Sequence, residues 1–485
     1  MLFNSFEFLL FFPIVTVIYF LLPHKFRWFH LLIASCVFYM AFIPVYILIL
    51  FLTIVVDYIA GIMIENAEGR RRKLFLAMSI VANVGILGVF KYYNFFVGNV
   101  NHVFLWTHIH ANLPLLKIIL PIGLSFHTFQ AMSYTIEVYR GNQKSERHFG
   151  IYALYVMFYP QLVAGPIERP QNMLHQFHEK HEFEYDEVVA GLRMIIWGLF
   201  KKAVIADRLA LFTDPVFNSP HEYSGTVLLI ATVFFAFQIF CDFSGYSNIA
   251  LGTARVMGFK LMVNFNWPYS AKSISEFWRR WHISLSTWFN DYVYNPISFP
   301  LRYYGSLAVI IASLCTFLIS GIWHGAAWHY IVWGGIHGVA IGYEALTRKT
   351  RKKIFKKIPP FIGNIIGITC TFSYVCFSYI FFRANNLKDA LYIVKKIPSA
   401  SGDFAIMLQG HMPSLQMPLA NARVILCVVV IGFLELVHMI QNKRSLNIVL
   451  QNQPRYLRWV IYYFFIMMIL YMGVFQNRMF IYFQF

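Results

Sequence analysis

Long apolar runs alternate with short polar loops along almost the whole chain. The run from Pro44 to Ile64 contains a single charged residue, Asp57, and the run from Gly305 to Trp323 contains none. About 20 such residues cross a bilayer core, and continuous rather than alternating hydrophobicity favours helices over a β-barrel. The pattern predicts an all-α, polytopic integral membrane protein with about 11–13 transmembrane helices. We expect these helices to begin near residues 5, 28, 44, 74, 113, 188, 226, 303, 326, 360, 420 and 456.

Two regions interrupt this pattern. Residues 148–186 combine an apolar stretch with prolines and glycines, and residues 242–302 mix apolar, aromatic and basic positions. Non-spanning backbone is tolerated at membrane depth only where protein or a wet cavity covers it. We therefore expect re-entrant or interfacial helices in both regions. Because no repeat and no long polar insertion divides the chain, we expect one integral domain over residues 1–485.

Composition supports the membrane prediction, and charge refines it. Of the 485 residues, 58% are hydrophobic and 13% are charged, whereas about 25% are charged in soluble domains. The net charge of +18 could suggest nucleic acid, but the cations gather in short loops such as Arg70–Lys73 and Arg348–Lys357. Such clusters are typical of cytoplasmic loops, with attraction to anionic membrane lipid as a second role. We expect no nucleic-acid partner.

The strongest chemical signal is the segment Ser320–Gly325, which closes an uncharged apolar run with Trp323 and His324. An ionisable side chain at this depth is costly and indicates a functional site. A neutral imidazole could act as a general base near neutral pH. The alternative is a packed histidine whose hydrogen bonds are made within the core.

A second feature extends from Glu276 to Asp291. Helical spacing places Trp278, Trp281 and Trp288 on one stripe, with Arg279 and Arg280 off it. This could be a basic amphipathic helix at the cytoplasmic face, or the arginines could frame the entry of an anionic ligand. His282 could then join His324 in one polar centre. The spacing alone leaves both interpretations open.

A third feature, Cys241–Asn248, ends a long apolar run in a dense polar cluster that includes Asp242, Ser244 and Tyr246. It is compatible with a simple helix end at the membrane interface, or with the lining of a cavity or a network that supports the site. His324 and His329 are five residues apart, whereas the two histidines of a zinc-binding helix are four apart. We expect no metal and no bound cofactor.

Taken in order along the chain, these motifs resemble the membrane-bound O-acyltransferase family. The bacterial members that O-acetylate alginate and peptidoglycan are the most similar, and those that D-alanylate teichoic acid are more distant. The matching segments are Leu120–Gln130, Tyr159–Ile167, Cys241–Asn248, Phe277–Asp291, Ser320–Gly325 and Phe480–Phe485.

The resemblance implies a ring of tilted helices around a central funnel. His324 matches the essential histidine of the family, and His282 matches its second signature histidine. It further implies that an acyl group, here acetyl, is taken from cytoplasmic acetyl-CoA. That group would cross the bacterial inner membrane to an extracytoplasmic acyltransferase or acceptor protein, for O-acetylation of a polysaccharide.

A mechanistic hypothesis accompanies this resemblance. The CoA phosphates would lie near Arg279, Arg280 or the Lys201–Lys202 pair, and His324 would take a proton from the acceptor hydroxyl. His282 or the Asp242–Tyr246 cluster would orient the acyl carbonyl or the imidazole. The alternatives are direct acylation of a lipid or protein, and, in another class, transport of a small anion without chemistry.

Overall fold

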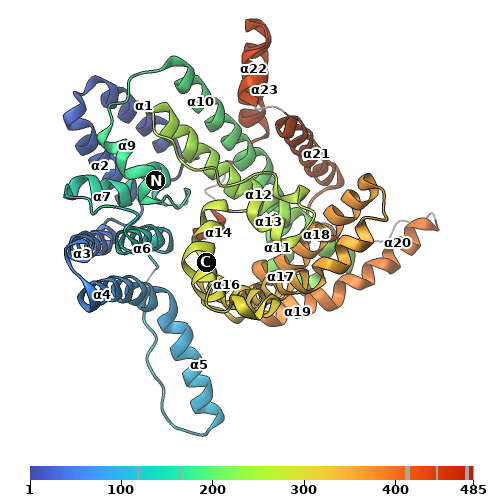
Figure 1. The fold of residues 1–485 in the computed structure, drawn as a ribbon. Helices are drawn as coiled ribbons and strands as arrows, with labels where there is room; N and C mark the ends of the chain where they lie inside the picture. Colours follow the sequence, from blue (N-terminus) through green and yellow to red (C-terminus); the bar gives the residue numbers. More distant parts are fainter. Residues whose placement is uncertain (118–119, 164, 410–415, 444–445, 476–479, 484–485) are drawn as a thin grey trace. The chain divides into compact units, whose positions relative to one another are not determined.

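The computed structural model describes residues 1–117, 120–163, 165–409, 416–443, 446–475 and 480–483 (Figure 1). Throughout these residues the regular structure is helical, without any β-strand. The chain forms two compact units. The first consists mainly of Met1–Ile195 and Tyr246–Val263, and the second of Ile196–Gly245 and Asn264–Ile481. The single domain over residues 1–485 stays a prediction.

Among the described residues, the first unit contains the last part of α12, from Tyr246 to Val256, and ten earlier helices or parts of helices. In chain order they are α1 (Phe6–Leu21), α2 (His24–Met40), α3 (Ile47–Asn66), α4 (Gly69–Leu87), α5 (Tyr93–Trp106), α6 (Leu124–Arg140), α7 (Phe149–Met157), α8 (Tyr159–Leu162), α9 (Pro170–His178) and most of α10 (Tyr185–Leu199).

The second unit holds the helices that carry the candidate chemistry. They are α11 (Asp207–Asn218), the first part of α12 (Gly225–Val256), α13 (Ile274–Arg280), α14 (Ile283–Phe289), α15 (Asn295–Ser298), α16 (Ser306–His324), α17 (Trp328–Phe355), α18 (Pro360–Arg383), α19 (Leu387–Lys396), α20 (Ala400–Leu408), α21 (Asn421–Lys443), α22 (Leu446–Gln451) and α23 (Arg455–Met472). Short 3-10 and π-helical turns connect several of them.

Six helical segments in the described part of the chain are long and apolar enough to cross a membrane. They are Pro44–Asn66, Gly69–Trp106, Gly225–Val256, Ser306–His324, Pro360–Arg383 and Asn421–Gln441. The prediction of an all-α, polytopic membrane protein is therefore confirmed. The total of 11–13 spans and the ring around a funnel stay predictions.

One expected helix start was wrong. Instead of a helix from residue 113, the described residues between α5 and α6 are non-helical, and α6 begins at Leu124. Two asparagines of α5 explain the difference. The Asn101 amide exchanges hydrogen bonds with the backbone N–H and C=O of Leu113, at 2.9 and 3.0 Å. The Asn94 amide does the same with Leu116, at 2.8 and 2.9 Å. Side chains thus supply the partners that a helix would otherwise give this backbone.

The only charge in the Pro44–Ile64 run lies inside the first unit. Asp57 is fully buried on α3, where it accepts hydrogen bonds from Ser79 at 2.6 Å and from the Asn83 amide at 2.8 and 2.9 Å. Both donors lie on α4, and Ser79 also contacts Thr135 of α6. A buried carboxylate is tolerated only when it is hydrogen-bonded in this way. The network therefore ties the three neighbouring helices together.

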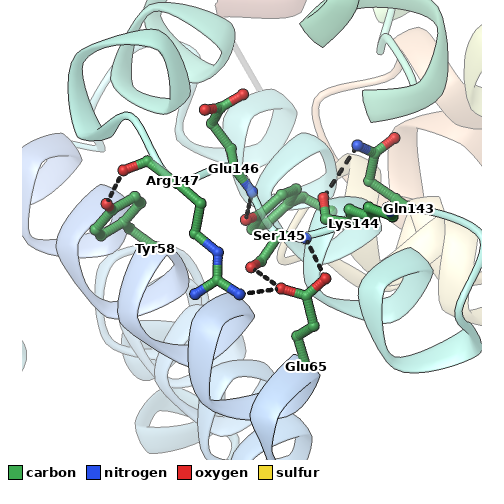
Figure 2. A network of polar contacts seen from close by, with 8 residues as sticks. Tyr58, Glu65, Gln143, Lys144, Ser145, Glu146 and Arg147 are labelled. Atoms are coloured by element: carbon green, nitrogen blue, oxygen red, sulfur yellow. Dashed lines mark hydrogen bonds and ion pairs between the residues drawn. The ribbon is translucent and has the colours of Figure 1, made fainter.

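The loop after α6 is fastened to α3 by a second polar network (Figure 2). Glu65, near the end of α3, accepts hydrogen bonds from the Ser145 hydroxyl and from the Arg147 guanidinium, the latter at 2.5 Å. The Tyr58 hydroxyl donates to the Arg147 carbonyl at 2.6 Å. These bonds hold the connection between α6 and α7 against α3.

Candidate active site

The helical hairpin α16–α17 carries the strongest sequence candidate. The two helices run antiparallel over most of the length of α16 and lie side by side in Figure 1. Gly334 makes this approach possible, because a Cβ at this position would overlap the backbone carbonyl of Phe317. Small residues at helix contacts are typical of membrane proteins, where close backbone packing stabilises association.

A polar stripe follows one face of α16. Ser313, Thr316, Ser320 and His324 are spaced by three or four residues, which places them on the same side of the helix. Their exposures are only 1%, 6%, 4% and 4%, so the stripe faces protein. It ends at His324 because Gly325 is extended, with φ −165° and ψ 149°, and the helix stops there. The hydroxyl groups therefore lead along the helix to the imidazole.

Aromatic rings enclose His324. The centroids of Trp323, Trp333 and Phe382 lie 4.8, 4.9 and 5.3 Å from that of the imidazole, each nearly perpendicular to it. Edge-to-face contacts at these distances are favourable and fix the orientation of the ring. The result is a buried imidazole at a helix end, with aromatic side chains around it. Its catalytic role stays a prediction.

The structure adds a residue that the sequence analysis missed, His337 of α17. The Trp278 indole N–H donates to its Nδ1 at 3.3 Å, and its Nε2 lies 3.0 Å from the Ser378 hydroxyl. Because Trp278 can only donate, Nδ1 must accept and Nε2 must carry the proton. Ser378 in turn donates to the Val375 carbonyl at 2.7 Å. His337 therefore holds Trp278 against α17 in one defined orientation.

This network borders the surroundings of His324. The Trp333 ring lies 5.0 Å from that of His337 and 5.8 Å from that of Trp278, and it also forms one wall around His324. The sequence signal that could have pointed to His337 was its position as the third histidine of the α16–α17 hairpin. It follows Trp333 by four residues and therefore lies on the same helix face. Only the tertiary contact with Trp278 gives it a connection to the candidate site.

The helical spacing through residues 278–288 is interrupted at His282, so no single amphipathic helix forms there. α13 ends at Arg280 and α14 begins at Ile283, because His282 adopts a left-handed conformation with φ 43° and ψ 56°. This conformation is uncommon for residues other than glycine. Asn264 stabilises the turn, since its Oδ1 accepts hydrogen bonds from His282 Nδ1 at 3.0 Å and from Ser284 at 2.9 Å. The imidazole is fully buried, with its ring 4.5 Å from that of Phe243.

A cavity of about 590 Å³ lies between these short helices and the polar stripe of α16. Ser313, Thr316 and Ser320 line one side, and Trp278 and Arg279 line another. Other lining residues include Ile283, Leu285, Phe289, Phe317 and Tyr294. Ser320 is one helical turn before His324. The cavity is thus largely apolar, with hydroxyl groups along the helix face that leads to the imidazole.

The two adjacent arginines of α13 have different surroundings. Arg279 is exposed at the cavity and makes no hydrogen bond or ion pair with another described residue. Arg280 instead donates to Glu276 at 2.6 Å and to the Ser270 hydroxyl at 2.7 Å. Trp281 is buried against Phe265 and Phe277, and it does not line the cavity. Of the four predicted positions 278–281, therefore, only the first two face this space.

The Cys241–Asn248 cluster lies within α12, so the alternative of a simple helix end is wrong. Asp242 forms an ion pair with Lys202 at 2.7 Å and accepts a hydrogen bond from the Ile481 backbone at 2.8 Å. Lys202 also pairs with Asp207 at 2.9 Å. These groups are buried, so they satisfy one another inside the protein. The structure thus places Asp242 in an internal ion-pair network.

Ser244 and Tyr246 have separate surroundings. Ser244 accepts a hydrogen bond from Lys201 at 2.9 Å, and Lys201 is itself only 3% exposed. Tyr246 belongs to the first unit, where its ring lies 4.5 Å from that of Phe3. Both lysines are buried and bonded to partners inside the protein, which makes them poor candidates for contact with the donor phosphates. Over the described residues no group of three or more His, Cys, Asp or Glu side chains is arranged to hold a metal ion.

The fold and site together define a class: a multi-pass helical membrane protein with a buried histidine and an adjoining apolar cavity. Comparison with known proteins agrees with this class. The family model described as MBOAT, membrane-bound O-acyltransferase family, matches residues 105–383. This range contains α6 to α18, together with His282 and His324.

Individual relatives cover most of the chain. The peptidoglycan O-acetyltransferase of Helicobacter pylori is 35% identical over 77% of this chain and 74% of its own length. The probable alginate O-acetylase AlgI of Pseudomonas aeruginosa is 38% identical over 80% and 73%. The teichoic acid D-alanyltransferase of Bacillus subtilis is 30% identical over 57% and 72%. The chain belongs to the membrane-bound O-acyltransferase family, and it is an acyltransferase.

Proposed function

We propose that this protein takes an acetyl group from cytoplasmic acetyl-CoA and passes it across the bacterial inner membrane for O-acetylation of an extracytoplasmic polysaccharide. The observation that carries the proposal is the apolar cavity whose hydroxyl stripe leads along α16 to His324. The relatives that modify alginate and peptidoglycan support a polysaccharide as acceptor. An extracytoplasmic acyltransferase or acceptor protein would complete the transfer.

The charges at the ends of the hairpin support the direction of transfer. α17 ends in a basic cluster, Arg348–Lys357, which the positive-inside rule places in the cytoplasm. Because α16 and α17 are antiparallel, His324 lies at the opposite end of the hairpin. The stripe from Ser313 to His324 covers 11 residues, or about 16 Å at 1.5 Å per residue. A thioester arm that enters from the cytoplasmic side would follow this stripe toward the imidazole.

The proposed chemistry uses His324 as a general base. The acceptor oxygen bonds to the thioester carbonyl carbon as the imidazole takes the hydroxyl proton. The carbon–sulfur bond then breaks, and the proton passes to the departing thiolate. General bases of this kind contribute roughly 10²–10⁴-fold in rate. The rings around His324 exclude water, which limits hydrolysis of the thioester. Arg279, at the cavity, would contact a donor phosphate, because guanidinium groups match phosphate oxygens.

The decisive experiment measures CoA release and acetyl transfer by the purified protein in proteoliposomes supplied with acetyl-CoA. We expect His324→Ala to lower the rate by about 10²–10⁴-fold while the protein folds normally. His329→Ala is the matched control, because His329 is buried in the same hairpin but bonds only the Phe381 carbonyl in the described structure, at 2.9 Å. Full transfer by His324→Ala would contradict the proposal, as would anion flux without CoA release.

The proposed contact between Arg279 and a donor phosphate can be tested with two matched variants. Arg279→Gln should raise the KM for acetyl-CoA about tenfold, the loss expected for one charge-assisted hydrogen bond of roughly 1.5 kcal/mol. Arg280→Gln removes the same charge one residue away, but from a side chain already paired with Glu276. It should leave KM nearly unchanged. Equal KM values for wild type and Arg279→Gln would show that the phosphates bind elsewhere.

A further inference from the structure

A second cavity in the second unit, of about 580 Å³, lies where α17 ends and α18 begins. Five of its lining residues are cations, and none is acidic. The cations are Lys272, Arg348, Arg351, Lys352 and Lys356. Neither the proposed donor channel nor His324 belongs to this cavity. It is therefore a strongly basic pocket to which the proposed reaction gives no role.

The cations form an arranged surface rather than a random cluster. Arg348, Lys352 and Lys356 are spaced by four residues, which places them on one face at the end of α17. Arg351 is held beside them by hydrogen bonds from its guanidinium to the Thr347 hydroxyl and the Glu344 carbonyl, at 3.1 and 2.9 Å. Both of those partners are neutral groups. The geometry thus gathers positive charge around one space.

No internal counter-charge balances this pocket. Among the described residues, none of the five side chains forms an ion pair with a carboxylate. The C-terminal end of α17 offers only about half an elementary charge of negative potential. That is too little to compensate five cations at close range. An external anion that enters this space would therefore meet positive charge that no described carboxylate offsets.

The remaining walls indicate what kind of anion fits. Phe355, Ile358 and Pro360 give the pocket an apolar side. It continues into α18, where Phe361 is 74% and Ile365 is 49% exposed. α18 is one of the six membrane-capable helices, so such exposed apolar side chains face lipid. We propose that this pocket binds a phosphate group, supplied by the headgroup of an anionic phospholipid whose chains lie along α18.

The chain offers a matched test of this proposal. One triple variant carries Arg348→Gln, Lys352→Gln and Lys356→Gln, which all line the pocket. The control carries Lys349→Gln, Lys353→Gln and Lys357→Gln, which have the same spacing one residue later and do not line it. Both variants remove three charges from the same exposed segment. They therefore separate a defined pocket from the general attraction of a basic loop to anionic membranes.

Lipid binding is measured by native mass spectrometry of the full protein with phosphatidylglycerol and phosphatidylcholine, and the melting temperature in neutral detergent reports folding. Wild type and control should prefer phosphatidylglycerol, whereas the pocket variant should bind it about fivefold more weakly for each cation removed. Equal loss in both triple variants, or no preference in wild type, would overturn the proposal. Because this readout needs no acyl transfer, it stands apart from failure of the proposed function.

The source of the phosphate is decided by competition. Inorganic phosphate and CoA are added to the complex of wild type with phosphatidylglycerol. If the lipid is the ligand, CoA should not displace it at concentrations that saturate acetyl transfer. If CoA displaces the lipid and the pocket variant also raises the KM for acetyl-CoA, the pocket holds the donor phosphates, and the assignment to lipid is wrong.

Discussion

His282 and His324 are both buried in the second unit, but their surroundings are of opposite kinds. His282 lies in a left-handed turn between two short helices, where the Asn264 side-chain oxygen accepts hydrogen bonds from His282 Nδ1 and from the Ser284 hydroxyl. His324 lies at the end of a long helix and is surrounded by the rings of Trp323, Trp333 and Phe382. The His282 site is built around hydrogen bonds, and the His324 site is built around packed aromatic rings.

Hydrogen bonds fix the orientation of the His282 ring, whereas aromatic rings around His324 exclude water from it. Because Asn264 Oδ1 accepts from Nδ1 of His282, neutral His282 carries its proton there, and its Nε2 is an acceptor. The rings of Trp323, Trp333 and Phe382 pack around His324 and shape its position by contact. We therefore expect His324 to be sensitive to loss of volume and His282 to be sensitive to loss of polar partners.

The largest effect should come from removing a wall of the His324 site. Trp333 is 2% exposed, and Trp333→Ala should lower the free energy of unfolding by about 3–5 kcal/mol, because the cavity cannot fully collapse. CoA release should fall as well, since His324 and Trp278 both contact this ring. Trp333→Phe should retain much of both properties. Denaturant unfolding and the CoA assay provide the test, and an unchanged stability in Trp333→Ala would contradict the packed-volume view.

Loss of the acceptor at the His282 turn should rank second. Asn264→Ala leaves three donors without their acceptor: His282 Nδ1, the Ser284 N–H and the Ser284 hydroxyl. With about 1–3 kcal/mol for each unsatisfied buried group and some access of water, we expect a loss of roughly 3 kcal/mol. Asn266→Ala is the control, since the Asn266 side chain is exposed and its backbone bond to Arg280 remains. Equal melting temperatures for the two variants would refute the proposed role of Asn264.

The pH dependence of stability should sharpen the comparison. His282 lies outside the six membrane-capable helices, and burial lowers its pKa from the usual 6.5 to about 3. Between these values the unfolded chain binds the proton and the folded protein does not, so stability falls as pH decreases below 6.5. From pH 7 to pH 5 this histidine should contribute a loss of about 2 kcal/mol. His282→Asn should remove that contribution in unfolding measurements at the two pH values, and an unchanged pH slope would show that another group carries it.

The smallest effect concerns the backbone of the same residue. A left-handed conformation costs roughly 1 kcal/mol for most side chains but less for asparagine, which adopts it more readily. His282→Asn should therefore be about 1 kcal/mol more stable than His282→Ala, as measured by unfolding in detergent. If both variants fold but neither releases CoA, the imidazole itself is needed. If His282→Asn keeps full activity, the residue serves the turn alone.

Periodicity and hydropathy predicted the helical membrane class, and the structure confirmed it through six membrane-capable helices. They failed where side chains from distant segments supply hydrogen bonds to the backbone. Asn94 and Asn101 hold residues after α5 in a non-helical path, and Asn264 breaks the expected helix at His282. Each of these partners lies at least 12 residues away in the chain, beyond the reach of a local helical pattern.

The sequence alone determined that an ionisable residue would be retained in an apolar helix, because the cost of His324 at that depth does not depend on the rest of the fold. It also marked the basic loops and the hairpin that carries them. Only the tertiary structure decided which neighbours each polar group has. In the folded protein Asp242 forms an ion pair with Lys202, Arg280 forms one with Glu276, and the Trp278 indole donates a hydrogen bond to His337. These pairings depend on distances between distant segments, which helical spacing does not specify. For this reason the contact between His337 and Trp278 could be found only in the folded protein.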